Sequence, residues 1–275
     1  MYPVLLKIGS FTIFNVKIGP LTIHTYGFMM ALGVALGLWF LYVQAKKQEL
    51  QASKLIDVAF YTIIVALLGA KLILFFGDLS YYLQNPKQLF SLARSGGVFQ
   101  GGLAFGFFFA LWLFRRNKIP AWKTADIIGP ALALGHSFGR LGCFSAGCCF
   151  GTECTVPWGV TFHNEYANSL TGVQLNTPLH PTQLYEALLN FISFLILFFI
   201  LRKKRFDGQV ISFYIINYSI IRYFVEFFRG DHEAKVYFIQ NASPYLSVSY
   251  PQLFSILALI AGFILLFVLK KKQSV

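Results

Sequence analysis

The sequence predicts an all-α integral membrane protein with about seven membrane-spanning helices and a small external head. Hydrophobic residues make up 56% of the 275 residues and charged residues only 12%, which is more apolar surface than a soluble domain can bury. Most of the long apolar stretches end in a cluster of lysine and arginine residues. The first residues lack a charged start followed by a continuous apolar run, so no cleavable signal peptide is expected.

The predicted spans are separated by polar connections and together form a single membrane domain over residues 1–275. We expect them at about 26–43, 55–76, 103–114, 125–143, 184–201, 209–228 and 250–269. Residues 1–25 alternate between apolar and polar side chains, which predicts strands or an interfacial segment. Residues 144–180 form a loop of mixed polarity, long enough for a small head subdomain inserted between the fourth and fifth spans.

The distribution of basic residues predicts the orientation of the chain. The connections after the first, third, fifth and seventh spans hold 14 lysine and arginine residues, whereas the opposite side holds 5. By the positive-inside rule the N-terminus and the 144–180 loop are external, and the C-terminus is cytoplasmic. The net charge of +12 is therefore explained by topology, and nucleic acid is not expected as a partner.

Residues 139–151 combine one arginine, three cysteines and four glycines at the external end of the fourth span. That span is the least apolar of the seven, because it also contains Pro130 and His136, and such a segment is tolerated only inside a bundle or beside water. A guanidinium at this depth is costly unless an anion meets it. We expect a lipid phosphate to meet Arg140; the alternatives are loop carbonyls or an ion pair with Glu153 or Glu186.

The sixth span carries a polar face formed by Tyr218, Arg222, Glu226 and Arg229. One interpretation is a buried ion pair between Arg222 and Glu226 and nothing more. The other is an anion site in which Glu226 orients Arg222, since two arginines from different helices suit a phosphate bidentately. Arg229 is close to the external end and could equally be an anchor that reaches the headgroups.

The fifth span opens with His-Pro-Thr-Gln-Leu-Tyr-Glu at residues 180–186. Thr182 or Pro181 followed by Glu186 fits the capping of a helix N-terminus. The run is more polar than a cap needs, however, so a wall of the site is an equal alternative.

The four cysteines, Cys143, Cys148, Cys149 and Cys154, admit several interpretations. Their spacing does not match the paired pattern of structural zinc sites, so we expect no metal. In an oxidising external compartment a disulfide of Cys149 or Cys148 with Cys154 is favoured.

Taken together, these motifs resemble the phosphatidylglycerol–prolipoprotein diacylglyceryl transferase family of bacteria. Tyr26 matches the family's functional tyrosine, and residues 95–103 are similar to its Gly-Gly-x-x-Phe-His-Gly-Gly-Leu loop, with Gln100 at the histidine position. The family signature Gly-Arg-x-Gly-Asn-Phe-x-Asn-x-Glu appears here with Cys143, Ala146 and Cys148 at its Asn, second Asn and Glu positions.

The resemblance implies transfer of diacylglyceryl from phosphatidylglycerol to the lipobox cysteine of prolipoproteins at the external leaflet of the bacterial inner membrane, with no cofactor. The catalytic residues that we expect are Tyr26, His24, Arg222 and Glu226. The residues expected to bind phosphatidylglycerol are Arg140, Gln100, Gly142, Gly151, His180, Gln183, Tyr185, Tyr218 and Arg229. His180 is the alternative to His24 as proton acceptor. Two other functions stay open: a transporter with an anion site, and a catalytically degenerate or redox-sensing relative of the transferase.

Overall fold

The computed structural model describes residues 3–9, 11–13, 16–18, 21–85, 88, 97–231 and 248–273. Over these ranges the protein is mostly helical, and it divides into two compact units. The first unit consists of Met1–Trp39 together with Ala125–Val275, and the second of Phe40–Thr124. All but one of the candidate site residues belong to the first unit.

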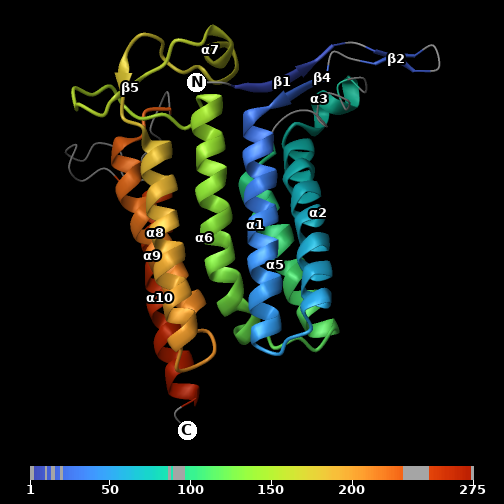
Figure 1. Ribbon diagram of the computed structural model, residues 1–275, viewed down its shortest axis with the longest axis vertical. Coiled ribbons are helices and arrows are strands. Elements are labelled where there is room, and N and C mark those ends of the chain that lie inside the picture. Colours follow the sequence, from blue (N-terminus) through green and yellow to red (C-terminus); the bar gives the residue numbers. More distant parts are fainter. Residues whose placement is uncertain are drawn as a thin grey trace. The chain divides into compact units, whose positions relative to one another are not determined.

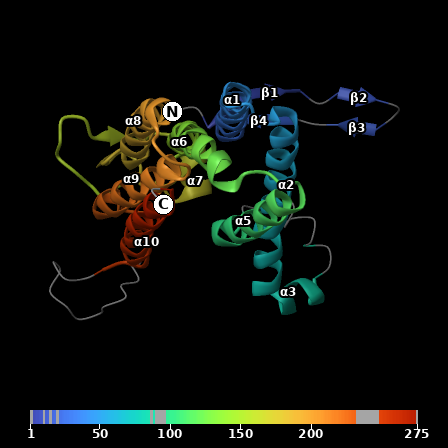
Figure 2. The ribbon, with the colours of Figure 1, turned by 90° about the horizontal axis from the view of Figure 1, so that it is seen from below.

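The helices of the first unit lie side by side, with α9 in contact with both α8 and α10 (Figures 1 and 2). They are the N-terminal part of α1 (Thr25–Lys47), most of α6 (Ala121–Ala146), α8 (Thr182–Lys203), α9 (Gln209–Val225) with its 3₁₀ extension η2 (Glu226–Phe228), and α10 (Tyr250–Gln273). Helices α1 and α6 approach closely where Gly33 meets Gly135, because a Cβ on Gly33 would lie 2.9 Å from the carbonyl oxygen of Gly135. Small residues at a helix crossing allow this approach.

The second unit is built on α2 (Ala52–Gly77) and α5 (Phe99–Arg116), which pack against each other, with the short α3 (Leu79–Gln84) after α2. Glycines again permit the contact. A Cβ on Gly69 would lie 2.4 Å from the Cβ of Phe105, so the aromatic side chain takes the space that a larger residue would need.

Five helices among the described residues are long and apolar enough to cross a membrane: α1, α2, α8, α9 with η2, and α10. Their large apolar side chains are widely exposed, as at Leu67 (65% exposed) and Phe254 (66% exposed), which suits contact with lipid. The expectation of a mostly helical membrane protein is therefore confirmed. Helices also form at the third and fourth predicted spans, but glycines and the polar residues of α6 reduce their apolar character, and the count of seven spans stays a prediction.

The alternating N-terminal segment forms strands, as the sequence predicts. Strand β1 (Val4–Ile8) pairs antiparallel with β4 (Leu21–His24), and β2 (Phe11–Ile13) pairs antiparallel with β3 (Val16–Ile18). Strand β4 runs directly into α1, so this segment leads to Tyr26.

The segment between α6 and α8 folds into a small head with its own core (Figure 1). It contains β5 (Val160–Thr161), α7 (Glu165–Thr171) and β6 (Pro178–Leu179), and β5 pairs antiparallel with β6. The buried residues of its core are Phe150, Phe162, Ala167, Val173 and Leu179. Asn164 caps α7, since its side chain accepts a hydrogen bond from the amide of Ala167 at 3.0 Å. The segment between α6 and α8 therefore has a fold and a small core of its own.

Candidate active site

Arg140 projects from α6 and forms an ion pair with Glu186 of α8. Its Nε atom also lies 3.2 Å from Nε2 of His136, one turn earlier on the same helix. The side chain of Arg140 is 14% exposed and that of Glu186 only 3%. Of the partners considered for Arg140 from the sequence, Glu186 is the one that the structure contains.

Glu186 joins two arginines from different helices. Its Oε1 atom lies 3.6 Å from Nη1 of Arg222 on α9, and Nη2 of Arg222 contacts Oε2 of Glu226 at 2.7 Å. Glu226 in turn accepts a hydrogen bond from the hydroxyl of Ser249, at the start of α10, at 3.3 Å. The predicted pair of Arg222 and Glu226 is thus present, but as one part of a network over four helices.

Five buried side-chain atoms of this region have no hydrogen-bond partner among the described residues. Three are carboxylate oxygens that belong to the ion pairs, and the other two are Nη1 of Arg222 and Oε1 of Gln183. The 3.6 Å from Nη1 to Glu186 is within the range of an ion pair but too long for a good hydrogen bond. Buried polar groups are nearly always satisfied, so a donor left over beside a second guanidinium suggests a place for a ligand.

Arg229 follows η2 and is held by Asp231. Its Nε and Nη2 atoms donate to the two carboxylate oxygens at 2.9 and 2.6 Å, and its side chain is 8% exposed. Burial lowers the pKa of this guanidinium, but the hydrogen bonds to Asp231, together with the negative charges of Cys149, Asp231 and Glu186, raise the pKa above its usual range. The side chain of Arg229 is therefore buried and paired with Asp231, and its role as an anchor that reaches the headgroups stays a prediction.

Gly151 connects the head to the residue before Pro181 at the start of α8 and to the residue that follows η2. Its amide donates to the carbonyl of His180 at 3.0 Å, and its backbone forms a bridge with Arg229. A Cβ at this position would lie 2.4 Å from the carbonyl oxygen of His180 and 2.8 Å from that of Phe228. Only glycine allows this approach, so Gly151 holds the site together by packing.

The start of α8 holds the loop that follows α6. The N-cap residue, Pro181, makes no side-chain capping bond, so the capping interpretation is wrong. Thr182 instead donates to the carbonyl of Cys149 at 2.7 Å, and Gln183 donates to that of Cys148 at 2.8 Å. These bonds fix the loop that follows α6 against the helix that carries Glu186.

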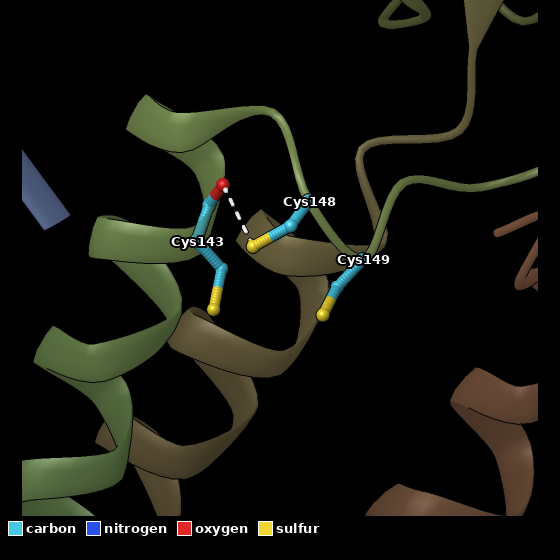
Figure 3. A group of neighbouring side chains, drawn as sticks. All are labelled: Cys143, Cys148 and Cys149. Carbon is cyan, nitrogen blue, oxygen red and sulfur yellow. Dashed lines mark hydrogen bonds between the residues drawn. The ribbon is translucent and has the colours of Figure 1, made fainter. Parts of the chain in front are cut away.

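The thiols of Cys143, Cys148 and Cys149 come together where α6 ends and the head begins (Figure 3). Their sulfur atoms all lie within 4.8 Å of one another. Gly147 and Cys149 have positive φ angles of 84° and 61°, and this turn brings the two loop cysteines back toward Cys143. All four cysteines are free thiols, so the disulfide of Cys149 or Cys148 with Cys154 is not formed in the structure.

The three thiols interact electrostatically with each other and with the arginines. Interaction with the thiols of Cys143 and Cys148 lowers the pKa of Cys149, and the charges of Arg229 and Arg140 lower it further.

Tyr26 and Gly142 lie together at the crossing of α1 and α6. A Cβ on Gly142 would be 3.3 Å from Cδ2 of Tyr26, so the glycine makes room for the tyrosine one residue before Cys143. Tyr26 is 41% exposed. His24 stacks on Tyr166 of the head at 6.4 Å between ring centroids, and within the described residues the structure does not join it to the arginine network.

His180, Tyr185 and Trp158 form a polar aromatic group beside the network. The hydroxyl of Tyr185 accepts a hydrogen bond from Nε1 of Trp158 at 2.8 Å and lies 3.2 Å from Nδ1 of His180. Tyr218 faces His136 at 5.4 Å between ring centroids. Tyr218 therefore faces the histidine that lies beside Arg140.

Gln100 is exposed on α5 and belongs to the second unit. Residues 95 and 96 of its glycine-rich loop lie outside the described residues. The structure therefore does not join Gln100 to the other site residues.

Sequence reasoning left four network residues out of the expected site: His136, Glu186, Asp231 and Ser249. His136 precedes Arg140 by four residues on one helix, and Asp231 follows Arg229 by two, so both had a local signal. The role of Glu186 as a bridge and the contact of Ser249 join distant segments, for which the sequence holds no local signal.

Helices long and apolar enough to cross a membrane, together with guanidinium and carboxylate groups buried beside a folded head, are typical of membrane proteins that bind an anionic group. The model of the family "Prolipoprotein diacylglyceryl transferase" matches residues 13–268. The chain therefore belongs to the prolipoprotein diacylglyceryl transferase family.

Relatives with the name phosphatidylglycerol–prolipoprotein diacylglyceryl transferase match most of the chain. One from Clostridium tetani is 35% identical, over 78% of this chain and 84% of the relative. One from Clostridium perfringens, numbered 2, is 32% identical over 90% and 92%. One from Finegoldia magna is 31% identical over 96% of both chains.

Proposed function

We propose that this protein transfers the diacylglyceryl group from phosphatidylglycerol to the thiol of the lipobox cysteine of prolipoproteins, releasing glycerol phosphate, as the first step of lipoprotein maturation. Relatives that carry the transferase name over nearly the whole chain support the reaction. The observation that carries the proposal is the buried network of Arg140, Glu186, Arg222 and Glu226, which leaves one guanidinium donor without a hydrogen bond among the described residues.

The position of Glu186 indicates how the lipid phosphate binds. Its carboxylate lies between Arg140 and Arg222, so two guanidiniums from different helices already share one anionic group. A phosphate has the same geometry of parallel oxygen acceptors, and Nη1 of Arg222 is available to donate to it. Arg140 holds the headgroup phosphate in this proposal, and Arg222 donates to it from the other side.

The leaving group gains negative charge as the ester bond breaks, and the site is arranged to stabilise that charge. Glu226 fixes the guanidinium of Arg222 at 2.7 Å, so the donor needs little reorganisation during the reaction. Tyr26, at the open crossing of α1 and α6, positions the substrate. His24 accepts the proton of the thiol, with His180 as the alternative.

The same proposal includes the arrangement in the membrane. Seven spans form one membrane domain over residues 1–275 in the bacterial cytoplasmic (inner) membrane, with the N-terminus and the head at 144–180 outside. The C-terminus is cytoplasmic. The placement of 14 lysine and arginine residues on the proposed cytoplasmic side and 5 on the other supports this orientation.

Mass spectrometry of a lipobox peptide tests the reaction directly. The purified protein is incubated with the peptide and vesicles that contain phosphatidylglycerol, and we expect the peptide cysteine to gain one diacylglyceryl group. A peptide with serine in place of the cysteine is the control and should stay unmodified. An unmodified cysteine peptide with folded protein would exclude the transferase function and favour a transporter or a degenerate, redox-sensing relative.

A further inference from the structure

The loop that carries two of the three clustered thiols is held rigidly. Its carbonyl groups at Cys148 and Cys149 accept hydrogen bonds from Gln183 and Thr182, and the hydroxyl of Thr171 donates to the carbonyl of Gly147 at 3.2 Å. Cys149 keeps a positive φ of 61°, which is uncommon for a residue with a Cβ. A conformation of this kind persists only where the surroundings impose it, and such residues concentrate at functional sites.

The sulfur atoms are close to the arrangement of a tetrahedral metal site. With metal–sulfur bonds of about 2.3 Å, neighbouring sulfurs of a tetrahedron are about 3.8 Å apart. The three sulfurs here lie within 4.8 Å of one another without any ion (Figure 3). A contraction of at most about one ångström, which rotation of the side chains can supply, would complete the geometry.

The group has three ligands and no more. Among the residues that the structure describes, no histidine, aspartate or glutamate side chain joins the three thiols. Structural zinc sites have four protein ligands, whereas catalytic zinc sites have three and leave a fourth position for water or substrate. The sequence spacing gave no indication of this arrangement, because the turn at Gly147 and Cys149 is what produces it.

We propose that Cys143, Cys148 and Cys149 bind a thiophilic divalent ion of the zinc class, and that its open fourth position takes the thiol of the incoming lipobox cysteine. This inference rests on the proposed transferase function and adds the means by which the substrate thiol is activated. Soft thiolate ligands select zinc and related ions over calcium or magnesium.

A thiol that binds a zinc-class ion loses its proton, so the ion supplies a nucleophile at neutral pH. The sulfur then attacks the glycerol carbon that bears the phosphate ester oxygen. The S–C bond forms while the C–O bond breaks, and its electron pair leaves with the oxygen of glycerol phosphate. The proton released from the thiol passes by way of His24 or His180 to glycerol phosphate or water, so atoms and charge balance without any oxidant or reductant.

The position of the cluster suits this role. Cys143 follows Arg140 by three residues on α6, which places the two side chains on one face of the helix, one turn apart. Gln183, which holds the carbonyl of Cys148, precedes Glu186 by three residues on α8. The proposed sites of the nucleophile and of the leaving phosphate therefore lie one turn apart on α6 and on α8. A transfer between two bound substrates requires that their reacting groups be held close together in this way.

The charges of the surroundings are also compatible. Three thiolates and one divalent ion carry a net charge of −1. Arg140 and Arg229 act electrostatically on the cluster, and their guanidiniums offset that charge.

The first test measures zinc binding by the full-length protein, reduced, metal-free and in detergent. Titration against a chromophoric zinc chelator should show one bound equivalent. Cys149→Ser should lose more than about 100-fold in affinity, since even loss of a residue that only supports a ligand costs about 10–100-fold. Cys154→Ser, which removes a thiol outside the cluster, should bind as the parent does. Absence of tight binding in the parent, or equal binding by Cys149→Ser, would overturn the proposal.

The second test uses Co²⁺ in place of zinc and does not depend on turnover. The cobalt–thiolate absorption of the protein should change when a lipobox peptide with cysteine is added, and stay unchanged with the serine peptide. A cobalt spectrum that stays unchanged when the cysteine peptide is added would mean a purely structural ion. It would overturn the proposal that the fourth position binds the lipobox thiol.

Transfer activity then separates the two proposals. Metal-free protein should lose at least about tenfold in rate and recover with zinc, in line with the contribution of a properly activated nucleophile. Full activity without metal would overturn the inference and leave the proposed function intact. A cobalt spectrum that responds to the peptide in a protein that never transfers diacylglyceryl would support the thiol-binding site and exclude the proposed function.

Discussion

Helix α6 carries two buried charges, Asp126 near its start and Arg140 near its end, and the two are treated in opposite ways. Asp126 is fully buried and accepts four hydrogen bonds: from Lys204 at 3.0 Å and from the amides of Gly208, Val210 and Ile211 at 2.9, 2.8 and 3.1 Å. Three of these donors belong to the first turn of α9, whose own N-cap residue makes no side-chain capping bond. Asp126 therefore caps α9 from another helix.

Arg140 is instead part of a group of charges that is paired but not saturated. Its partner Glu186 is shared with Arg222, and Nη1 of Arg222 and Oε1 of Gln183 have no hydrogen bond among the described residues. Burial of charge is costly in both regions, but only around Asp126 do hydrogen bonds within the protein offset that cost fully. Asp126 therefore serves the fold, whereas the Arg140 region has buried polar atoms that are free to bind a ligand.

The largest effect on stability should come from Asp126→Ala. The change leaves Lys204 and three buried amides without their acceptor, and breaking a buried pair of this kind costs about 3–5 kcal/mol. Thermal unfolding in detergent measures it. Activity per folded molecule should stay near that of the parent, and a stable Asp126→Ala protein that has lost transfer activity would contradict the assignment of this residue to the fold.

Arg222→Ala should instead lower the rate of the reaction, and Arg222→Lys should lower it by nearly as much. Removal of one donor to a developing anion lowers the rate by about 100–1000-fold. Lysine keeps the charge but cannot contact Glu186 and Glu226 and also donate to the phosphate. Peptide lipidation rates, compared at equal folded protein, give the measurement.

Arg115→Ala is the matched control for this pair of variants. Arg115 is exposed in the last turn of α5, and its loss should leave the rate unchanged. If Arg222→Lys and Arg115→Ala were equally active, Arg222 would have no role as a phosphate donor.

Gly151→Ala should have an intermediate effect. The added methyl group would meet the carbonyl of His180 at 2.4 Å, so the head must shift away from α8 and η2, at a cost of about 1–3 kcal/mol. We expect a lower unfolding temperature together with slower transfer, since the same backbone bridge holds Arg229. Gly77→Ala, where no atom lies within 4 Å of the added Cβ, is the control and should change neither.

The helices could be predicted from the sequence because hydropathy, basic clusters and glycine positions are local signals. Observed helices begin and end within a few residues of the expected spans, as for α8 at Thr182–Lys203 against 184–201. The pair of Arg222 and Glu226 was also predictable, since a spacing of four residues on a helix determines the contact.

The remaining site contacts were not predictable, because they depend on how distant segments pack. The pair of Arg140 and Glu186 was one of several alternatives for Arg140, because the two residues lie 46 positions apart along the chain and nothing in the pattern of either helix selects the other. The thiol cluster depends on the positive φ angle of Cys149, and no sequence pattern predicts this backbone conformation for a cysteine. The interpretation of residues 180–186 as a cap failed because their side chains bind the carbonyls of the cysteine loop instead.

The smallest effect is expected at Ser249, which supports the network from the start of α10. Its hydroxyl donates to Glu226 at 3.3 Å and accepts a hydrogen bond from the amide of Gln252 at 3.4 Å. Ser249→Ala therefore removes a hydrogen bond to a buried carboxylate and a cap of α10, each worth about 0.5–1.5 kcal/mol. If Glu226 acts by orienting Arg222, this loss should lower kcat by less than about tenfold with KM little changed, and Ser249→Thr should restore it. Ser255→Ala removes a hydroxyl that donates only to the carbonyl of Pro251 within α10, so it is the matched control. A drop in unfolding temperature without a change in kcat would show that Ser249, like Asp126, serves the fold. The functional network would then end at Glu226 and would not include the start of α10.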